Sequence, residues 1–389
     1  MTPLLPTARW IRCSVAAVAT ILLVAGCSSD GGGKVSTFSD DDAPDRAEVI
    51  GAVIDDVIVP AYEDVATTTE ELADTTASLC ATPGAETLDA ARASWQQAMS
   101  AWQATEAFRF GPAKDLKSNS DIAYEVDLGK LEDDLNTPGE LPESIDVTVV
   151  GDLGADVRGL AAIEQILFSA DDSAATDPRR CAFAAAASQL VADGAVELRD
   201  AWTVGVDGDE PFAEQMRSPG GDSMYADETE VLADLVNGSI AALTTVADMY
   251  LGPASGADGA EPAPASVDPG AAHRAGTDVV EMLDSVRSIY GERPDEDSPT
   301  DTGLGALVAA QSLSTDARMS GDLADAAEAL AAVTTPYADL VVGDEAQAAQ
   351  FDALTEAYDN VVAARVTLRT EIASQLGVTV SFSDSDGDG

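Results

Sequence analysis

The stretch LDAARASWQQAMSAWQAT, residues 88–105, decides the fold. Its apolar and small side chains recur in steps of three and four residues, which is the period of one face of an α-helix. The positions on this face are Leu88, Ala91, Trp95, Ala98, Trp102 and Thr105. Because two tryptophans share the stripe, we expect this helix to face the centre of a helical bundle.

The same helical period recurs along the rest of the chain, and strand-like alternation is essentially absent. Helices are expected at residues 44–59, 60–79, 158–168, 180–202, 228–250, 276–290, 304–313, 321–333 and 345–376. Residues 111–156 are charged and broken by prolines, which makes this segment a candidate functional insertion. The sequence therefore predicts an all-α protein.

A segment dense in glycine and proline, residues 252–272, is the best internal boundary. It would separate an N-terminal helical bundle, residues 44–251, from a C-terminal one, residues 273–382. The segments Gly159–Ala162 and Gly303–Ala306 both read Gly-Leu-x-Ala, which hints at a duplication. We therefore expect two packed bundles.

Residues 1–26 have the pattern of a lipoprotein signal peptide, with two arginines, a short apolar run and small residues directly before Cys27. The apolar run is too short for a stable membrane span. We expect cleavage before Cys27 and lipid attachment to it, which would give an extracytoplasmic protein anchored to the cell membrane. Residues 27–43 would form a flexible tether, and no later segment is expected to span a membrane.

Two cysteines, Cys80 and Cys181, remain once the leader is removed and Cys27 is lipidated. An oxidising compartment favours a disulfide between them, provided that the two helices that carry them lie side by side. Two buried free thiols are the alternative.

The chain has 70 acidic and 20 basic residues, a formal net charge of -50. Proteins bind the phosphate backbone of nucleic acids through clustered lysine and arginine. Because acidic residues are in such excess here, we expect no nucleic-acid partner. A cationic ligand or a metal ion is compatible with the acidic field, and so is an acidic surface that only keeps the protein soluble. Residues 383–389 contain the opening half of an EF-hand loop without its glutamate, so we expect an acidic tail there.

Segments from nearly the whole mature chain, taken in order, resemble the imelysin family of exported bacterial proteins. The matching pieces are VPAY at 59–62, EAFRFGP at 106–112, RGLAAIEQILF at 158–168, RCAF at 180–183, LVN at 235–237, GLGALV at 303–308 and LGVTVSFSD at 376–384. The resemblance implies two bundle-like helical domains with a functional site near their interface. It also implies a signature, Gly-x-His-x-x-Glu, whose histidine and glutamate were proposed as metal ligands. Gly159 and Glu164 match it, but Ala161 stands at the histidine position and has no lone pair to offer a metal.

Glu164 lies close to the apolar face of its predicted helix, so its carboxylate needs a partner. The candidates for an ion pair that holds two bundles in register are Arg109, Arg158 and Arg318. The functional alternative is a site for a hard cation or a substrate, with Glu106 and Asp121 as further oxygen donors. Such donors suit calcium, magnesium or ferric iron.

The residue inventory disfavours a peptidase with a histidine-based zinc site, because no His-Glu-x-x-His motif occurs. The only histidine, His273, lies beside the glycine- and proline-rich segment, where a solvated or packing role is expected. Serine and cysteine catalysis lack the usual neighbouring base. The sequence thus leans against an enzyme and leaves the cofactor open, with iron and calcium as candidates.

We therefore expect an extracytoplasmic imelysin-like lipoprotein that acts as a binding module in the acquisition of iron or another metal. Its partners would be the membrane, through the lipid on Cys27, and a metal-uptake protein in that membrane. The alternatives are an imelysin-type peptidase with an altered metal site and a structural or adaptor lipoprotein. The metal role comes from the resemblance, and the composition only permits it.

Overall fold

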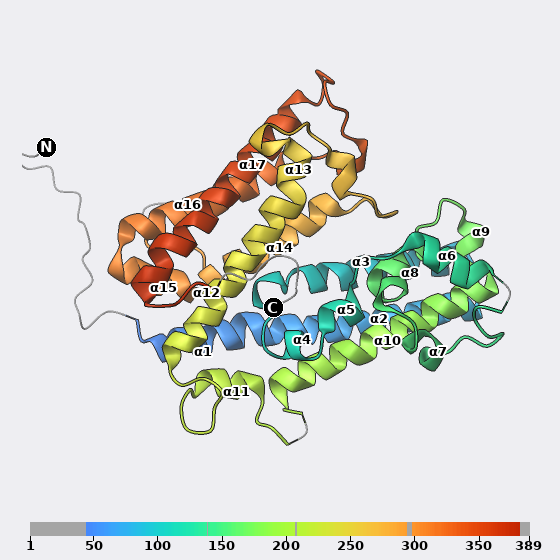
Figure 1. The fold of residues 1–389 in the computed structure, drawn as a ribbon, viewed down its shortest axis with the longest axis horizontal. Coiled ribbons are helices and arrows are strands. Elements are labelled where there is room, and N and C mark those ends of the chain that lie inside the picture. The colour runs from blue at the N-terminus through green and yellow to red at the C-terminus, as the bar shows by residue number, and fades with distance from the viewer. Residues whose placement is uncertain (1–43, 138, 207, 294–297, 382–389) are drawn as a thin grey trace, which may run out of the picture. The chain divides into compact units, whose positions relative to one another are not determined.

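The computed structural model describes residues 44–137, 139–206, 208–293 and 298–381, and helices make up the regular secondary structure in these ranges (Figure 1). The predicted all-α class is confirmed. All the described residues belong to one compact unit. The predicted signal peptide, the lipidated Cys27, the tether and the acidic tail at 383–389 lie outside the described residues.

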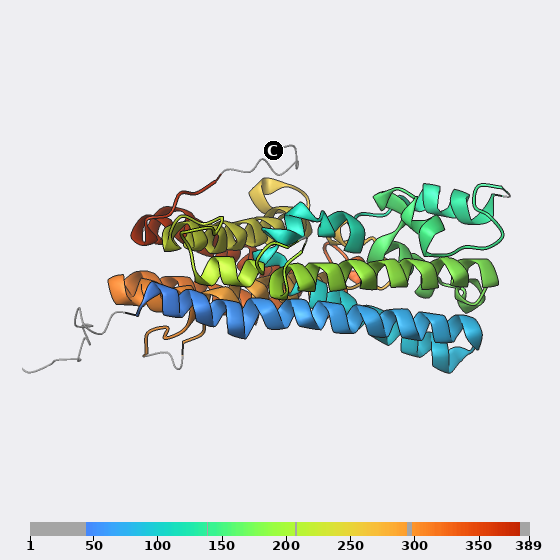
Figure 2. The ribbon, with the colours of Figure 1, turned by 90° about the horizontal axis from the view of Figure 1, so that it is seen from below.

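A long N-terminal helix forms the first part of the fold. Helix α1 (Arg46–Val53) continues through a π-helical turn, η1 (Ile54–Ile58), into α2 (Val59–Ala81). The wide turn directly precedes Pro60, which has no N–H to continue the α-helical ladder. Figure 2 shows α1 and α2 as one continuous rod, with α10 (Pro178–Thr203) running alongside it.

Helix α3 (Ala85–Gln103) packs on α2 and buries the stripe that the sequence indicates. All six stripe positions are buried, and Trp95 and Trp102 are 0% and 1% exposed. The same helix also contacts α14, more than 170 residues further along the chain. The prediction that α3 faces the centre of a bundle is therefore confirmed.

Short helices connect α3 to α10. They are η2 (Glu106–Phe108), α4 (Pro112–Asp115), α5 (Ser118–Ile122), α6 (Leu128–Asn136), α7 (Val147–Gly151), η3 (Ala155–Val157), α8 (Gly159–Leu167) and α9 (Asp172–Ala175). The segment predicted to be irregular is thus built of single helical turns. Aspartates start three of these helices, because Asp127 accepts from the Lys130 N–H, Asp146 from the Val149 N–H and Asp171 from the Ser173 N–H.

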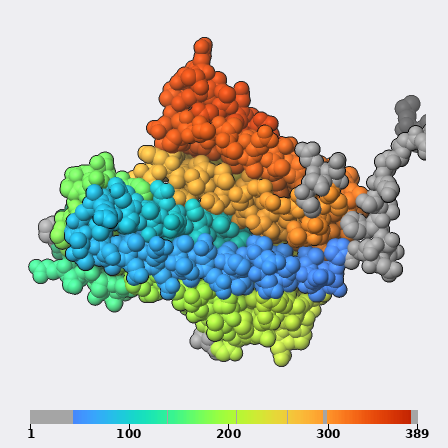
Figure 3. Space-filling view, turned by 180° about the vertical axis from the view of Figure 1, so that it is seen from behind, coloured from blue at the N-terminus to red at the C-terminus, as the bar shows by residue number. Residues whose placement is uncertain are grey.

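The second half of the chain is also helical. Its elements are α11 (Phe212–Arg217), α12 (Glu228–Thr244), η4 (Thr245–Leu251), α13 (Gly252–Ser255), η5 (Ala257–Gly259), η6 (Pro264–Val267), α14 (Ala275–Tyr290), α15 (Gly303–Gln311), α16 (Leu313–Ala331), η7 (Tyr337–Asp339), α17 (Ala348–Thr367), η8 (Leu368–Ile372) and α18 (Ala373–Leu376). Helices α16 and α17 form a close pair. Figure 3 shows α1–α3 lying between these C-terminal helices and the segment around α11.

The predicted division into two bundles stays a prediction, and the predicted duplication is not confirmed. Helix α12, which the sequence places in the first bundle, packs on η2 and also on α14 and α17. Gly159 and Gly303 do share a local geometry, since each begins a nine-residue helix with a positive φ, at 79° and 58°. This likeness is confined to one turn of chain.

The predicted start of the helix at residue 321 is wrong. Helix α16 begins at Leu313, because the Ser312 side chain accepts from the Thr315 N–H and caps the helix. Gly321 lies inside this helix with open space beside it, so the glycine is tolerated there.

Two helical stretches, 178–203 and 228–255, reach the length and mean hydropathy of membrane spans, although none is expected from the sequence. In each stretch, 56% of the most apolar 18-residue window is buried inside the protein. Both stretches occupy central places in the helix packing, and core helices have the same apolar composition.

The predicted disulfide between Cys80 and Cys181 is confirmed. It joins the end of α2 to the start of α10, and the two Cα atoms are 5.5 Å apart. The bridge therefore fixes the far end of the longest helix pair in the fold.

Replacing Cys80 and Cys181 together by serine is expected to lower the free energy of unfolding by about 3–5 kcal/mol. The reason is that the bridge closes a loop between residues 101 positions apart, and the unfolded chain regains that freedom without it. Urea denaturation of the oxidised protein and the variant measures the difference. Reduced wild type should unfold like the variant, and a variant as stable as the oxidised protein would contradict the expectation.

Candidate functional site

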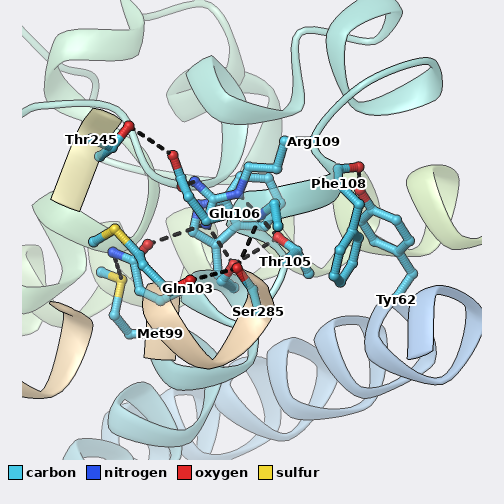
Figure 4. Close-up of polar contacts among 12 residues, drawn as sticks. Tyr62, Met99, Gln103, Thr105, Glu106, Phe108, Arg109, Thr245 and Ser285 are labelled. Carbon is cyan, nitrogen blue, oxygen red and sulfur yellow. Dashed lines mark hydrogen bonds and ion pairs between the residues drawn. The ribbon is translucent and has the colours of Figure 1, made fainter. Parts of the chain in front are cut away.

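The turn after α3 is fixed by Arg109, which bonds the end of that helix (Figure 4). Its guanidinium donates to the Trp102 carbonyl oxygen and to the Gln103 side chain. It also donates to the Thr105 hydroxyl and lies 4.0 Å from the centroid of a Trp102 ring. A cation is favourable here because the last carbonyls of a helix carry partial negative charge.

Glu106 connects this turn to the second half of the chain. Its carboxylate pairs with Arg109 at 2.5 Å and accepts from the Thr245 hydroxyl of η4 at 3.2 Å. The neighbouring Ala107 N–H donates to the Ser285 hydroxyl of α14. Burial lowers the pKa of Arg109, and the Glu106 carboxylate opposes that shift. Elements from both halves thus meet around η2.

Glu164 lies nearby in the same interior region, on α8, with 8% of its surface exposed. One carboxylate oxygen accepts from the Ala272 N–H at 2.8 Å. Gly270 allows this approach, because a Cβ atom there would lie 2.4 Å from the Glu164 Oε1. Burial raises the pKa of Glu164, and the bond from Ala272 opposes the shift.

Two further carboxylates, Asp268 and Asp278, lie close to Glu164. Asp268 accepts from the Ala275 N–H at the start of α14 and from the Ala338 N–H in η7. Asp278 pairs with the Arg274 guanidinium at 2.6 Å. Burial raises the pKa of Asp278 to about 6, although Arg274 opposes the shift.

Arg274 is the cation that these carboxylates share. Besides pairing with Asp278, its guanidinium donates to the Gln96 carbonyl oxygen and the Ser100 hydroxyl of α3. It lowers the pKa of both Glu164 and Asp278, whereas Asp268 raises both. Glu164 and Asp278 therefore share one arginine, with Asp268 as a further acid nearby, so three buried carboxyl groups have one guanidinium among them. We call Glu164, Asp268, Arg274 and Asp278 the carboxylate cluster.

The segment 252–272 contributes backbone to the carboxylate cluster, and its predicted role as a linker between two bundles stays a prediction. It contains α13, η5 and η6, and it buries Pro264 and Asp268. It also supplies Gly270 and the Ala272 N–H to Glu164. Glycine and proline serve here to bring a backbone close to a carboxylate, which composition alone does not distinguish from a linker.

The predicted pairing of Glu164 with Arg109, Arg158 or Arg318 is wrong. Arg109 pairs with Glu106, Arg158 pairs with Asp121 at 2.5 Å, and Arg318 pairs with Glu371. Arg318 and Glu371 are about half exposed on α16 and η8. The basic side chain that lowers the pKa of Glu164 is Arg274.

The three predicted oxygen donors are Glu106, Asp121 and Glu164. Each has a different partner, so they do not converge on one bound ion. Across the ranges that the structure describes, no group of three or more histidine, cysteine, aspartate or glutamate side chains is arranged to hold a metal ion. A metal held at Glu164 would need Asp278 to leave Arg274.

His273 is half exposed, with its Nδ1 atom 3.9 Å from an Asp268 oxygen. It has a positive φ of 50° and lines a cavity of about 360 Å³ together with the first turn of α14 and the 330–337 segment. This is compatible with the solvated role expected from the sequence.

These residues lie where α3, α8 and α14 meet. The family model for imelysin matches residues 58–368. The chain belongs to the imelysin family. Iron-regulated protein A of Synechococcus elongatus is 26% identical over 206 residues, which is 53% of this chain and 54% of that protein. The chain thus matches about half the length of this curated relative.

Two solved structures show the same fold. An imelysin-like protein from Psychrobacter arcticum 273-4 has a TM-score of 0.65 and 18% identity, over 90% of this chain and 100% of that chain. An iron-regulated protein A precursor from Parabacteroides distasonis ATCC 8503 has a TM-score of 0.68 and 17% identity, over 86% and 97% of the two chains. At these identities the likeness extends to the fold alone.

The imelysin signature begins α8 in this chain. Gly159 has a φ of 79°, and a Cβ atom there would lie 2.8 Å from the Ile122 carbonyl oxygen, so glycine is required. Ala161 and Glu164 are three residues apart and therefore share a helix face. The methyl group of Ala161 thus stands where the signature imidazole would adjoin Glu164.

Sequence reasoning missed Asp268, Arg274 and Asp278. Arg274 and Asp278 are four residues apart at the start of a predicted helix, and this spacing is a usable signal for an ion pair. No comparable signal marks Asp268, because it lies among exposed-looking residues in the glycine- and proline-rich segment.

Changing Asp278 to asparagine is expected to alter how stability depends on pH. The folded pKa of Asp278 is about 6 and its ordinary value is 3.8, so the folded protein binds the proton more tightly. Ionisation therefore costs wild type up to about 3 kcal/mol of unfolding free energy as the pH rises from about 4 to about 6. The stability of Asp278→Asn relative to wild type should rise through this window in urea denaturation.

The control for this experiment is Asp352→Asn, which removes the same charge from an exposed position on α17. Its stability difference from wild type should stay constant between pH 4 and 6 to within about 0.5 kcal/mol. A flat difference for Asp278→Asn as well would show that Asp278 ionises freely in the folded protein.

Proposed function

We propose that this imelysin-family protein is an exported, lipid-anchored binding module in iron-related metal handling, and that the carboxylate cluster is its ligand site. The observation that carries the proposal is the burial of Glu164 beside Asp268 and Asp278 with only one arginine among them. Repulsion among desolvated carboxylates is relieved when a cation binds. The names of two relatives, both iron-regulated protein A, support iron as the cation.

The chemistry of the cluster favours hard cations. Its donors are carboxylate oxygens, which suit ferric iron or calcium, whereas the imidazole of the family signature is replaced by Ala161. A metal ion has to compete with the Arg274 guanidinium for Asp278. We therefore expect a moderate, micromolar affinity and not the tight affinity of a closed structural site. The leader and Cys27 support an extracytoplasmic place of action and a lipid anchor.

Glu164→Gln is expected to weaken metal binding by at least about tenfold, because it removes the negative charge from the centre of the cluster and leaves the shape unchanged. Calorimetry of the purified protein with ferric iron, calcium and zinc measures this. The matched control is Glu371→Gln, the same change in the exposed pair with Arg318.

The control protein should bind like wild type. The proposal fails if wild type binds none of the three ions at micromolar concentrations, or if Glu164→Gln and Glu371→Gln have equal effects. A response to zinc alone would also contradict it, since the oxygen donors favour harder cations.

An imelysin-type peptidase with an altered metal site is the enzymatic alternative. It would predict cleavage of a generic protein substrate that is abolished by chelator and by Glu164→Ala. Cleavage with both properties would replace the binding-module proposal, because the carboxylate would then act in catalysis.

A further inference from the structure

A second cavity, of about 460 Å³, lies beside the Arg109 turn and outside the carboxylate cluster. It is lined by Trp102, Arg109, Ala113, Lys114, Lys117, Asn119, Ser120 and Tyr124. No carboxylate is among the lining residues. This is unusual in a chain with 70 acidic and 20 basic residues.

The two lysines of this cavity are not engaged by any other side chain. Over the described ranges every arginine has a polar, ring or electrostatic interaction, and Lys130 pairs with Asp156. The side chains of Lys114 and Lys117 make no hydrogen bond or ion pair there. In so acidic a protein, unpaired cations that gather at one cavity leave a local positive site.

The neighbouring acid does not neutralise these lysines. Asp115 lies between them in the sequence, but it does not line the cavity and pairs with neither lysine. Lys114 lies in α4, and Lys117 is the left-handed residue that precedes α5. Both line the same cavity, where no carboxylate of the lining separates the two like charges.

The remaining lining groups suit an organic anion. Asn119 and Ser120 have side-chain donors that make no hydrogen bond within the described residues. Trp102 and Ala113 form a buried apolar floor, and Tyr124 is 45% exposed. Donors and cations can bind carboxylates, while the apolar floor and the tyrosine ring can contact a carbon skeleton.

Arg109 lines the same cavity with its charge already paired to Glu106. Four of its N–H groups are used by Trp102, Gln103, Thr105 and Glu106, so its orientation is set before a ligand arrives. Pre-orientation of a charged donor lowers the entropic cost of binding.

From these observations we infer that the cavity formed by Lys114, Lys117, Asn119 and Ser120 over Trp102 binds a small organic polycarboxylate. The volume of about 460 Å³ is that of a small-molecule pocket and exceeds the need of a single inorganic anion. The ligand binds either free or as a metal chelate, because the cations contact its carboxylates in both forms. The inference goes beyond the metal function proposed above and involves different side chains.

The test is calorimetry of the purified protein with metal-free citrate, ferric citrate and inorganic phosphate. Wild type is expected to bind citrate in the micromolar to low millimolar range and phosphate more weakly. The double change Lys114→Gln with Lys117→Asn should weaken citrate binding by at least about tenfold, because it removes both charge-assisted contacts. Asparagine is chosen at position 117 because the backbone there is left-handed, with a φ of 56°.

Lys130→Gln is the matched control, since it removes a lysine charge that is paired outside the cavity. It should change citrate binding by less than about twofold. Both altered lysines are exposed, and circular dichroism and urea denaturation check that the double variant is folded.

The inference is overturned if citrate gives no binding heat at millimolar concentration, if phosphate binds as tightly as citrate, or if Lys130→Gln weakens binding as much as the double variant. Because metal-free citrate is the probe, these results do not depend on the carboxylate cluster. Citrate binding without any metal response at Glu164 would support the cavity and reject the proposed metal site.

Discussion

The buried hydrogen bond from the Trp95 indole N–H to the Leu160 carbonyl oxygen, 2.8 Å long, is the contact on which both parts of the site depend. It holds α3 against α8, so that Glu164 lies within reach of the backbone that leads into α14. A buried indole donor without an acceptor would cost free energy, so the helix has one favoured register. From the same helix, Gln96 and Ser100 hold Arg274, and the last turn holds Arg109.

Charge is distributed unevenly in this protein, and the distribution separates two binding environments. Burial turns Glu164, Asp268 and Asp278 into a negative interior cluster with one arginine. Elsewhere in the chain, the cavity beside α4 and α5 is lined by Lys114 and Lys117, whose side chains have no acidic partners. Arg109 lines the basic cavity and also interacts electrostatically with Asp278 of the carboxylate cluster. The cation site and the organic-anion site that we propose therefore involve different side chains.

The π-helical turns allow one long helix to contribute to both the apolar core and the polar turn around η2. Helix α12 passes into η4, which brings Thr245 to Glu106, and the proline at position 253 follows directly. A wide turn tolerates the missing proline N–H without ending the helix. The helix can therefore contribute to the core with one part and to the polar turn with the next.

The sequence by itself determined the all-α class and the buried face of α3, because helical periodicity acts locally. Its motifs resembled the imelysin family, and its cysteine count left a Cys80–Cys181 disulfide or two free thiols. It also pointed to Glu164, since a carboxylate on an apolar helix face must be paired or used. Only the tertiary structure decided which partners meet: Arg274 instead of Arg318, and the backbone of the glycine- and proline-rich segment beside Glu164. The physical reason is that side chains more than a hundred residues apart are brought together by packing of whole helices, and no local pattern records which helix faces will touch.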